Sequence, residues 1–193
     1  GTTITINGYT AGVTPFISNL HLTVSNTAVL KSIQFTIHPK PGSVTRPLSG
    51  TYANYYLVDR GFENLQTGAI TLPIYGLYDG STNPVTLTYG FADGSSREAN
   101  IMITAPPYDD LCGYKNPTVL QDRTNSTDLS YDYIFISNGG CGPHAPVILD
   151  TDGELRWVSP TSIQPSLRAS SLFINNAVYE TDGSTLNRVD LDG

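Results

Sequence analysis

Short runs in which apolar and polar residues alternate constrain this sequence most, because helical periodicity is scarce throughout the chain. His21–Val24 and Ser32–His38 alternate in this way, and so do residues 70–75. Turn residues interrupt the runs roughly every 8–12 positions, so that about seven strands are expected in the first 105 residues or so. The pattern predicts an all-β chain that begins with an immunoglobulin-like or fibronectin-like β-sandwich. The Cys…Trp…Cys signature of antibody domains does not occur in this part of the sequence.

Two stretches refine the predicted sandwich. Tyr52, Tyr55 and Leu57 are expected near one strand that ends before Gly61. The last two strands are expected to form a hairpin whose turn is Ala92-Asp93-Gly94-Ser95, because an Asp-Gly pair between alternating runs favours a tight turn.

Composition excludes several classes of function. Only 14% of the residues are charged, so Thr, Ser, Asn, Gly and Tyr must supply most of the polar surface. The net charge of −7 and the scattered basic residues argue against binding to nucleic acid. No segment approaches 18 consecutive apolar residues, and no membrane span is expected. Because the sequence starts at Gly1 in strand-like residues, a mature or trimmed chain is expected.

The domain organisation follows from a break at Pro106 and Pro107, which cannot donate hydrogen bonds to a β-ladder. We expect an Ig-like sandwich over residues 1–107, a linker over 108–129 and a second β-region over 130–193. The linker contains a glycosylation sequon at Asn125, which has meaning only in a eukaryotic secretory pathway.

A repeated unit marks the second β-region. The stretch 147–153 reads VILDTDG and the stretch 177–183 reads AVYETDG, and a further DLDG occupies positions 190–193. Repeated strand–[DE]-x-D-G–strand units are typical of β-propellers and β-solenoids. We expect residues 130–193 to be the first hairpins of a β-propeller with incomplete blades, because a propeller needs at least about four blades.

The acidic residues of these units are interpreted as turn residues. Asp152-Gly153 would supply the positive φ angles of a hairpin and Asp150 would cap it, with Val147 and Leu149 facing the core and Trp157 opposite them. A calcium loop and a pair of carboxylates for glycoside hydrolysis are the alternatives. Gly153 falls at the fourth position of an EF-hand pattern, and Thr161 at the twelfth cannot supply a bidentate carboxylate. The predicted hairpin-turn residues are Asp150, Asp152, Gly153, Glu180, Asp182 and Gly183.

Other reactive residues suggest no catalytic site. Cys112 and Cys141 both lie in glycine-containing loops and are predicted to form a disulfide. Alternatives are free thiols, a zinc site that includes His144, and a nucleophilic Cys141–His144 pair, which a disulfide would exclude. His21 and His38 lie on strands with no acid nearby in the sequence. The sequence therefore predicts no catalytic residue, no metal and no cofactor for this chain.

Two stretches together resemble a known family. Residues 70–94 contain "GLY" followed by a "VTL" strand, as at the end of the N-terminal β-domain of bacterial arylsulfate sulfotransferases. Residues 131–157 end in "DTDGELRW" and resemble the entry into the propeller of these enzymes, where D-x-x-G-x-x-R-W hairpins occur. The order of the two regions, a small sandwich before a propeller, is similar as well.

The resemblance implies an exported protein, periplasmic or secreted, from a bacterium. Its full-length form would move a sulfuryl group from a phenolic sulfate ester to a phenol, through a propeller histidine and without a nucleotide cofactor. His144 does not match that histidine, so we expect this chain to be the inactive N-terminal portion. The resemblance is compatible with a homo-oligomer. The alternative is a non-enzymatic surface or adhesion module that presents loops.

Overall fold

A computed structural model describes residues 1–124, 131–136, 146–160, 170–174, 176–181 and 185–193. Two antiparallel sheets form the N-terminal sandwich. The first has the strand order β1 (Ile4–Ala11), β2 (Ile17–Val24) and β5 (Ala69–Tyr75). The second has the order β4 (Leu48–Ala53), β3 (Leu30–Ile37), β6 (Thr82–Phe91) and β7 (Ser96–Thr104). The expected seven strands and the expected all-β fold are confirmed.

The core of the sandwich lies between these two sheets. Alternate residues of β2 and β3 are buried, as their sequence pattern predicts, and Leu20, Ile33, Phe35 and Leu72 are fully inaccessible to solvent. Because successive side chains of a strand point to opposite faces, one apolar face from each sheet closes the core. The β6–β7 hairpin turns at residues 92–95 as expected, with Phe91 N–H donating to the Ser95 carbonyl at 2.9 Å.

One strand prediction is wrong. Tyr52 lies in β4, which ends at Ala53, but Tyr55 and Leu57 lie in α1 (Asn54–Asp59), a helix of six residues. Gly61, with φ 71°, ends this helix rather than a strand, and its N–H donates to the Val58 carbonyl at 3.0 Å. Leu57 is fully buried, so burial of one helical side chain outweighs the β propensity of the two neighbouring tyrosines.

Two further sheets follow the sandwich. One has the order β10 (Leu155–Val158), β9 (Val147–Asp150) and β8 (Tyr133–Ile136), and the other β11 (Ser170–Ile174), β12 (Ala177–Thr181) and β13 (Leu186–Asp190). We call them together the C-terminal sheets. Each is antiparallel with three strands, and the repeated sequence units supply the central strands β9 and β12. Within the described ranges these strands do not close into a barrel or a propeller.

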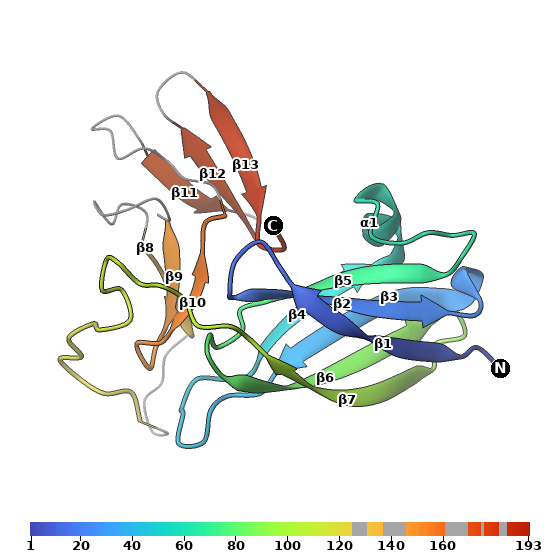
Figure 1. The fold of residues 1–193 in the computed structure, drawn as a ribbon, viewed down its shortest axis with the longest axis horizontal. Helices are drawn as coiled ribbons and strands as arrows, with labels where there is room; N and C mark the ends of the chain where they lie inside the picture. Colours follow the sequence, from blue (N-terminus) through green and yellow to red (C-terminus); the bar gives the residue numbers. More distant parts are fainter. Residues whose placement is uncertain (125–130, 137–145, 161–169, 175, 182–184) are drawn as a thin grey trace.

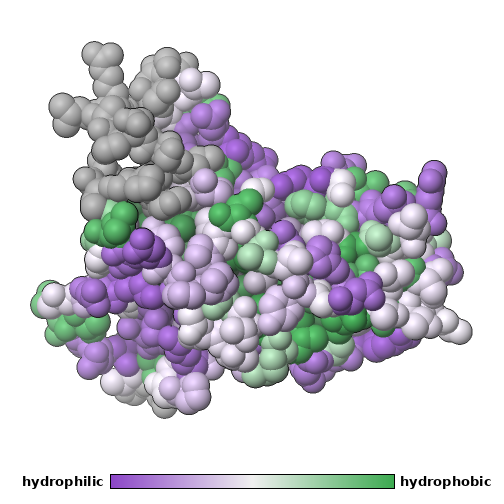
Figure 2. Space-filling view, viewed as in Figure 1, coloured by the Kyte–Doolittle hydropathy of each residue, from purple (hydrophilic) through white to green (hydrophobic). Residues whose placement is uncertain are grey.

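Figure 1 shows how the two regions are arranged. The strands of the sandwich run along the long axis of the molecule, and the C-terminal sheets stand at an angle to them at one end. The N-terminus lies at the opposite end of the sandwich. On the face drawn in Figure 2, pale residues of middling polarity cover much of the sandwich, as the low content of charged residues leads one to expect. The junction between the two regions lies at the end of the sandwich that is opposite the N-terminus.

Candidate functional site at the junction of the sandwich and the C-terminal sheets

The turn between β9 and β10 is built from the Asp-Thr-Asp-Gly motif. Gly153 N–H donates to the Asp150 carbonyl at 3.0 Å, and the Asp150 Oδ1 accepts the N–H groups of Asp152 and Glu154, both at 3.0 Å. Gly153 has φ 84°. The expectation of positive φ angles at both Asp152 and Gly153 is wrong for Asp152, since only the glycine adopts one. A two-residue hairpin loop of type I′ needs positive φ angles at both residues. This loop has three residues and needs a positive φ angle only at its glycine.

Asp150 also forms a buried ion pair. Its Oδ2 lies 3.0 Å from Arg156 Nη1, and the two side chains are at most 2% exposed. The same guanidinium donates from Nε to the Gly76 carbonyl at 2.8 Å and lies 3.9 Å from the ring centroid of Tyr78, both in the sandwich. Burial raises the pKa of Asp150, although the turn N–H groups and Arg156 act in the opposite direction. Asp150 thus holds Arg156 in position between the two regions.

Asp152 projects from the same turn onto the loop between β3 and β4. It accepts hydrogen bonds from the hydroxyls of Ser43 and Thr45, the latter at 2.7 Å, and from the Val44 N–H at 3.5 Å. Burial alone would raise the pKa of Asp152, but these hydrogen bonds bring it below its usual value. The second aspartate of the motif is therefore a contact between regions and not only a turn residue.

Ion pairs surround this contact. Asp132, just before β8, binds Arg46 Nε at 2.6 Å and Arg123 Nη1 at 2.6 Å. Lys40 Nζ lies 3.1 Å from the Glu154 carboxylate, and both side chains are about two-fifths exposed. Charges of opposite sign thus face each other across the junction. The partially exposed pairs contribute less than the buried ones, because water screens them.

The DLDG turn after β13 makes a second contact with the sandwich. Gly193 N–H donates to the Asp190 carbonyl at 3.1 Å, as Gly153 does to Asp150. Arg60, which caps the C-terminal end of α1, donates to Asp190 and to Asp192, both at 3.0 Å. Tyr56 OH donates to Asp192 at 2.8 Å. Burial raises the pKa of Asp192, although the bonds from Tyr56 and Arg60 work to lower it.

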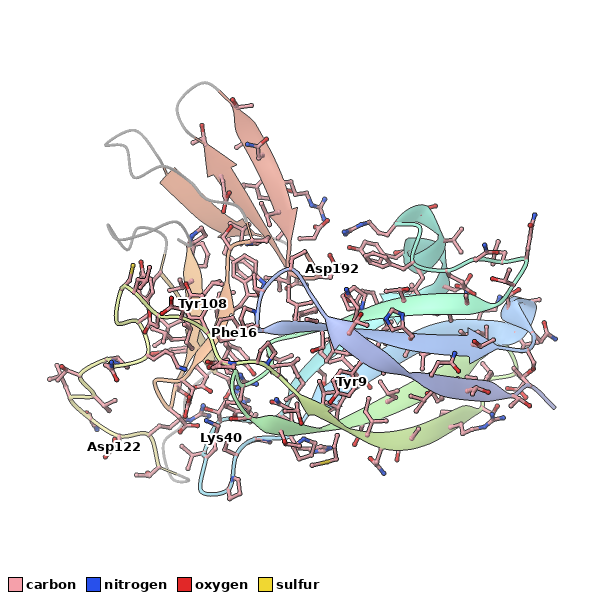
Figure 3. The ribbon with its side chains drawn as sticks, in the orientation of Figure 1. Tyr9, Phe16, Lys40, Tyr108, Asp122 and Asp192 are labelled. Atoms are coloured by element: carbon pink, nitrogen blue, oxygen red, sulfur yellow. The ribbon has the colours of Figure 1, made fainter. Side chains whose placement is uncertain are left out.

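Two small apolar clusters complete the junction. Phe16, just before β2, packs with Val147 and Leu149 and lies 5.3 Å from the Tyr108 ring (Figure 3). Trp157 belongs to the other cluster, and its Nε1–H donates to the Leu191 carbonyl at 3.0 Å. The prediction that Trp157 lies opposite Val147 and Leu149 is therefore wrong. A register shift between Leu155 and Trp157 turns the indole to the other face of the sheet.

A cleft of about 710 Å³ lies between the two regions. Residues of β4, α1 and β5 line one wall, and residues of β8, β10 and β13 line the other. Aromatic side chains line the cleft on both walls. They are Tyr52, Tyr55, Tyr56, Tyr75, Tyr133, Phe135, Trp157 and Phe173.

The other predicted site residues lie away from the turn between β9 and β10 or outside the described residues. Glu180, buried on β12, accepts a hydrogen bond from Ser159 Oγ at 2.8 Å. Cys112 lies in the loop after β7, whereas Cys141, Asp182, Gly183 and His144 lie outside the described residues, so the Cys112–Cys141 pairing stays a prediction. His21 and His38 bind the hydroxyls of Thr10 and Thr86, at 2.9 and 2.7 Å.

No three His, Cys, Asp or Glu side chains gather in the described part of the chain in a way that could hold a metal ion. No helix in that part is long and apolar enough to cross a membrane.

Local sequence patterns do not reveal the partners of Asp152 and Asp192, which lie more than 100 residues away along the chain. The sequence feature that points to these contacts is the second aspartate of each Asp-x-Asp-Gly motif. In the exposed turn at 92–95 a single aspartate suffices, and its Oδ1 accepts the N–H and the hydroxyl of Ser95.

Comparison with known proteins assigns the sandwich. No curated protein matches the chain. The profile of the arylsulfotransferase Ig-like domain matches residues 4–106, which is more than half of the chain and includes all seven strands of the sandwich. The resemblance seen in the sequence is thereby confirmed for this region. The chain belongs to the arylsulfotransferase family, and residues 4–106 form its Ig-like domain.

Proposed function

We propose that this chain is the non-catalytic, N-terminal part of an exported arylsulfotransferase-like protein, in which the Ig-like domain supports the first strands of a β-propeller. The observation that carries the proposal is the docking of both Asp-x-Asp-Gly turns on the Ig-like domain, by Asp152 on Ser43 and Thr45 and by Asp192 on Tyr56. Within the described residues each C-terminal sheet has three short antiparallel strands, whereas a propeller blade typically has four, so the two sheets would be incomplete blades.

The reaction of the full-length protein would be sulfuryl transfer from a phenolic sulfate ester to a phenol, through a sulfohistidine and without a nucleotide cofactor. A histidine that carries a sulfuryl group needs cationic or amide donors around the sulfuryl oxygens. His21 and His38 face threonine hydroxyls on strands of the sandwich, and neither lines the cleft at the junction. His144 lies outside the described residues and does not match the propeller histidine of the family. We therefore assign the sulfuryl-carrying histidine to the full-length protein and to none of the three histidines of this chain.

The assay uses p-nitrophenyl sulfate as donor and a phenol as acceptor. This chain alone should release no p-nitrophenol above the buffer rate, whereas a longer protein that contains it should release p-nitrophenol when the acceptor is present. Release by this chain that is abolished by His144→Ala would contradict the non-catalytic assignment. A longer protein that is inactive with every phenol would remove the enzymatic part of the proposal.

Export and a disulfide belong to the same proposal. A Cys112–Cys141 bridge would join the segment after the sandwich to the residues between β8 and β9 in the sequence, and disulfides persist in oxidising compartments such as the periplasm. Mass spectrometry of the intact chain before and after reduction tests it, with a gain of two hydrogens expected. An unchanged mass would contradict the bridge.

A further inference from the structure

The cleft at the junction has the size and lining of a small-molecule site. Its volume of about 710 Å³ lies within the range of roughly 300–1,000 Å³ that is typical of ligand pockets, which often form between domains. One wall carries Tyr52 and Tyr56, whose ring centroids are 5.9 Å apart and whose planes are inclined by 32°. The other carries Phe135 and Phe173, at 5.7 Å and 33°. Each wall thus presents a pair of neighbouring rings.

The depth of burial differs along the cleft. Trp157 and Tyr52 are only 2% and 4% exposed, whereas Tyr55 is 72% exposed and Phe173 is 37% exposed. Exposed aromatic rings at the edge of a concave surface leave apolar area in contact with water. A flat ring inserted between the walls would cover that area and stack against the aromatic faces.

The charges in the cleft restrict the ligand further. Each charged residue that lines it and lies in the described ranges already has a partner of opposite sign. Arg156 pairs with Asp150 and Arg188 with Asp190, while Asp190 and Asp192 both bind Arg60. An ionic ligand would lose its hydration without finding a free counter-charge, which is unfavourable.

We propose that this cleft binds a small, uncharged, planar aromatic molecule between the Ig-like domain and the C-terminal sheets. The proposal is independent of sulfuryl transfer, because it rests only on the lining of the cleft. A ligand that contacts both walls would also hold the two regions together, since it binds only when they are docked.

The single tryptophan of the chain makes the test direct, because Trp157 lines the cleft. We would label the chain with 5-fluorotryptophan and follow its one ¹⁹F resonance during titration with 2-naphthol and, separately, with 2-naphthyl sulfate. For 2-naphthol we expect a saturable shift with a Kd at or below about 1 mM, as for a fragment-sized ligand. For the anionic ester we expect binding at least about tenfold weaker. A resonance that does not move with 2-naphthol, or equal affinity for the two compounds, would overturn the proposal.

Two exposed tyrosines provide matched variants. Tyr55→Ala removes a ring from the cleft, whereas Tyr131→Ala removes a 52% exposed ring that does not line it. Tyr55→Ala should weaken 2-naphthol binding about 2- to 10-fold, as expected for one lost aromatic contact, and Tyr131→Ala should leave it unchanged. Phe173→Ala on the opposite wall should weaken binding similarly. Equal effects of Tyr55→Ala and Tyr131→Ala would identify nonspecific binding and refute the site. Because sulfuryl transfer is assayed separately, failure here leaves the proposed function intact.

Discussion

The Ig-like domain and the C-terminal sheets are both antiparallel β-structures, but they are stabilised in different ways. In the Ig-like domain, 19 buried residues form one continuous apolar cluster between two sheets. In the described part of the C-terminal sheets the apolar clusters are small, and one of them depends on Phe16 from the Ig-like domain. Four charged residues are also buried in this part, namely Asp150, Arg156, Glu180 and Asp192.

This difference shows that antiparallel β-structure can be stable by itself in one region and can depend on contacts with a neighbouring domain in another. A continuous core lets the Ig-like domain exclude water by itself. The C-terminal sheets are held by charged and hydroxyl contacts that need the Ig-like domain as a partner. Changes in the core should therefore unfold both regions, whereas changes at the junction should release only the C-terminal sheets.

The largest effect is expected for a change in the core of the Ig-like domain. Leu72→Ala removes a fully buried side chain on β5 and should lower the free energy of unfolding by about 2–5 kcal/mol. The matched control is Leu186→Ala on β13, whose side chain is 70% exposed and whose loss should cost less than about 0.5 kcal/mol. Urea denaturation measures both. Similar losses for the two variants would contradict the claim that the continuous apolar core stabilises the Ig-like domain.

A smaller effect is expected when the buried ion pair is broken. Asp150→Asn keeps an oxygen for the turn N–H groups but leaves Arg156 without its negative partner, and should destabilise the C-terminal sheets by about 1.5–3 kcal/mol. The control is Asp93→Asn in the exposed turn of the β6–β7 hairpin, for which no measurable change is expected. Emission from Trp157 reports the C-terminal sheets selectively. If Asp93→Asn and Asp150→Asn behave alike, the ion pair does not stabilise the junction.

Lowering the pH should change the contributions of Asp132 and Asp192 to the stability of the fold in opposite directions. Burial alone would raise the pKa of Asp132, but hydrogen bonds from Arg123 and Arg46 lower it below its ordinary 3.8. Its contribution to stability is present above that value and is lost as the pH falls through the lowered pKa. The pKa of Asp192 is raised by burial, so its contribution is present at low pH and is lost as the pH rises through the raised pKa.

Variants separate these two contributions. Between neutral pH and about pH 3, Asp132→Asn should reduce the loss in melting temperature seen in the unmodified chain, because the acid-sensitive contribution is gone. Asp192→Asn should increase that loss, because a contribution that favours the folded state in acid is gone. Calorimetry at several pH values measures the melting temperature. Shifts of the same sign in both variants would show that the two contacts do not differ in this way.

The smallest effect is expected for an exposed ion pair at the junction. Lys40→Ala removes the partner of Glu154, and both side chains are about two-fifths exposed. We expect a loss of about 0.2–1 kcal/mol that shrinks further as salt is added. Urea denaturation at low and high salt measures it. A loss as large as that of Asp150→Asn would mean that this pair contributes far more than its exposure suggests.

Sequence patterns predict much of the Ig-like domain because alternation directly reports which face of a strand is buried. They are less informative where tertiary contacts decide the local structure, as in α1, where burial of Leu57 overrides a strand-like stretch of tyrosines. The turn at 150–153 is predictable from its Asp-Gly pair, but the register shift that redirects Trp157 leaves no local signal. The contact between Asp152 and Ser43 joins residues 109 positions apart, which one sequence alone does not connect.

Hydrogen exchange on the intact chain tests most directly whether the Ig-like domain supports the C-terminal sheets. We would compare the unmodified chain with a double variant, Asp152→Ala and Arg60→Ala, which removes one partner from each docked turn. The account predicts faster exchange in β9, β10, β12 and β13 of the double variant, with exchange in β2, β3, β5 and β6 unchanged. Equal acceleration in both regions, or no change in either, would contradict it.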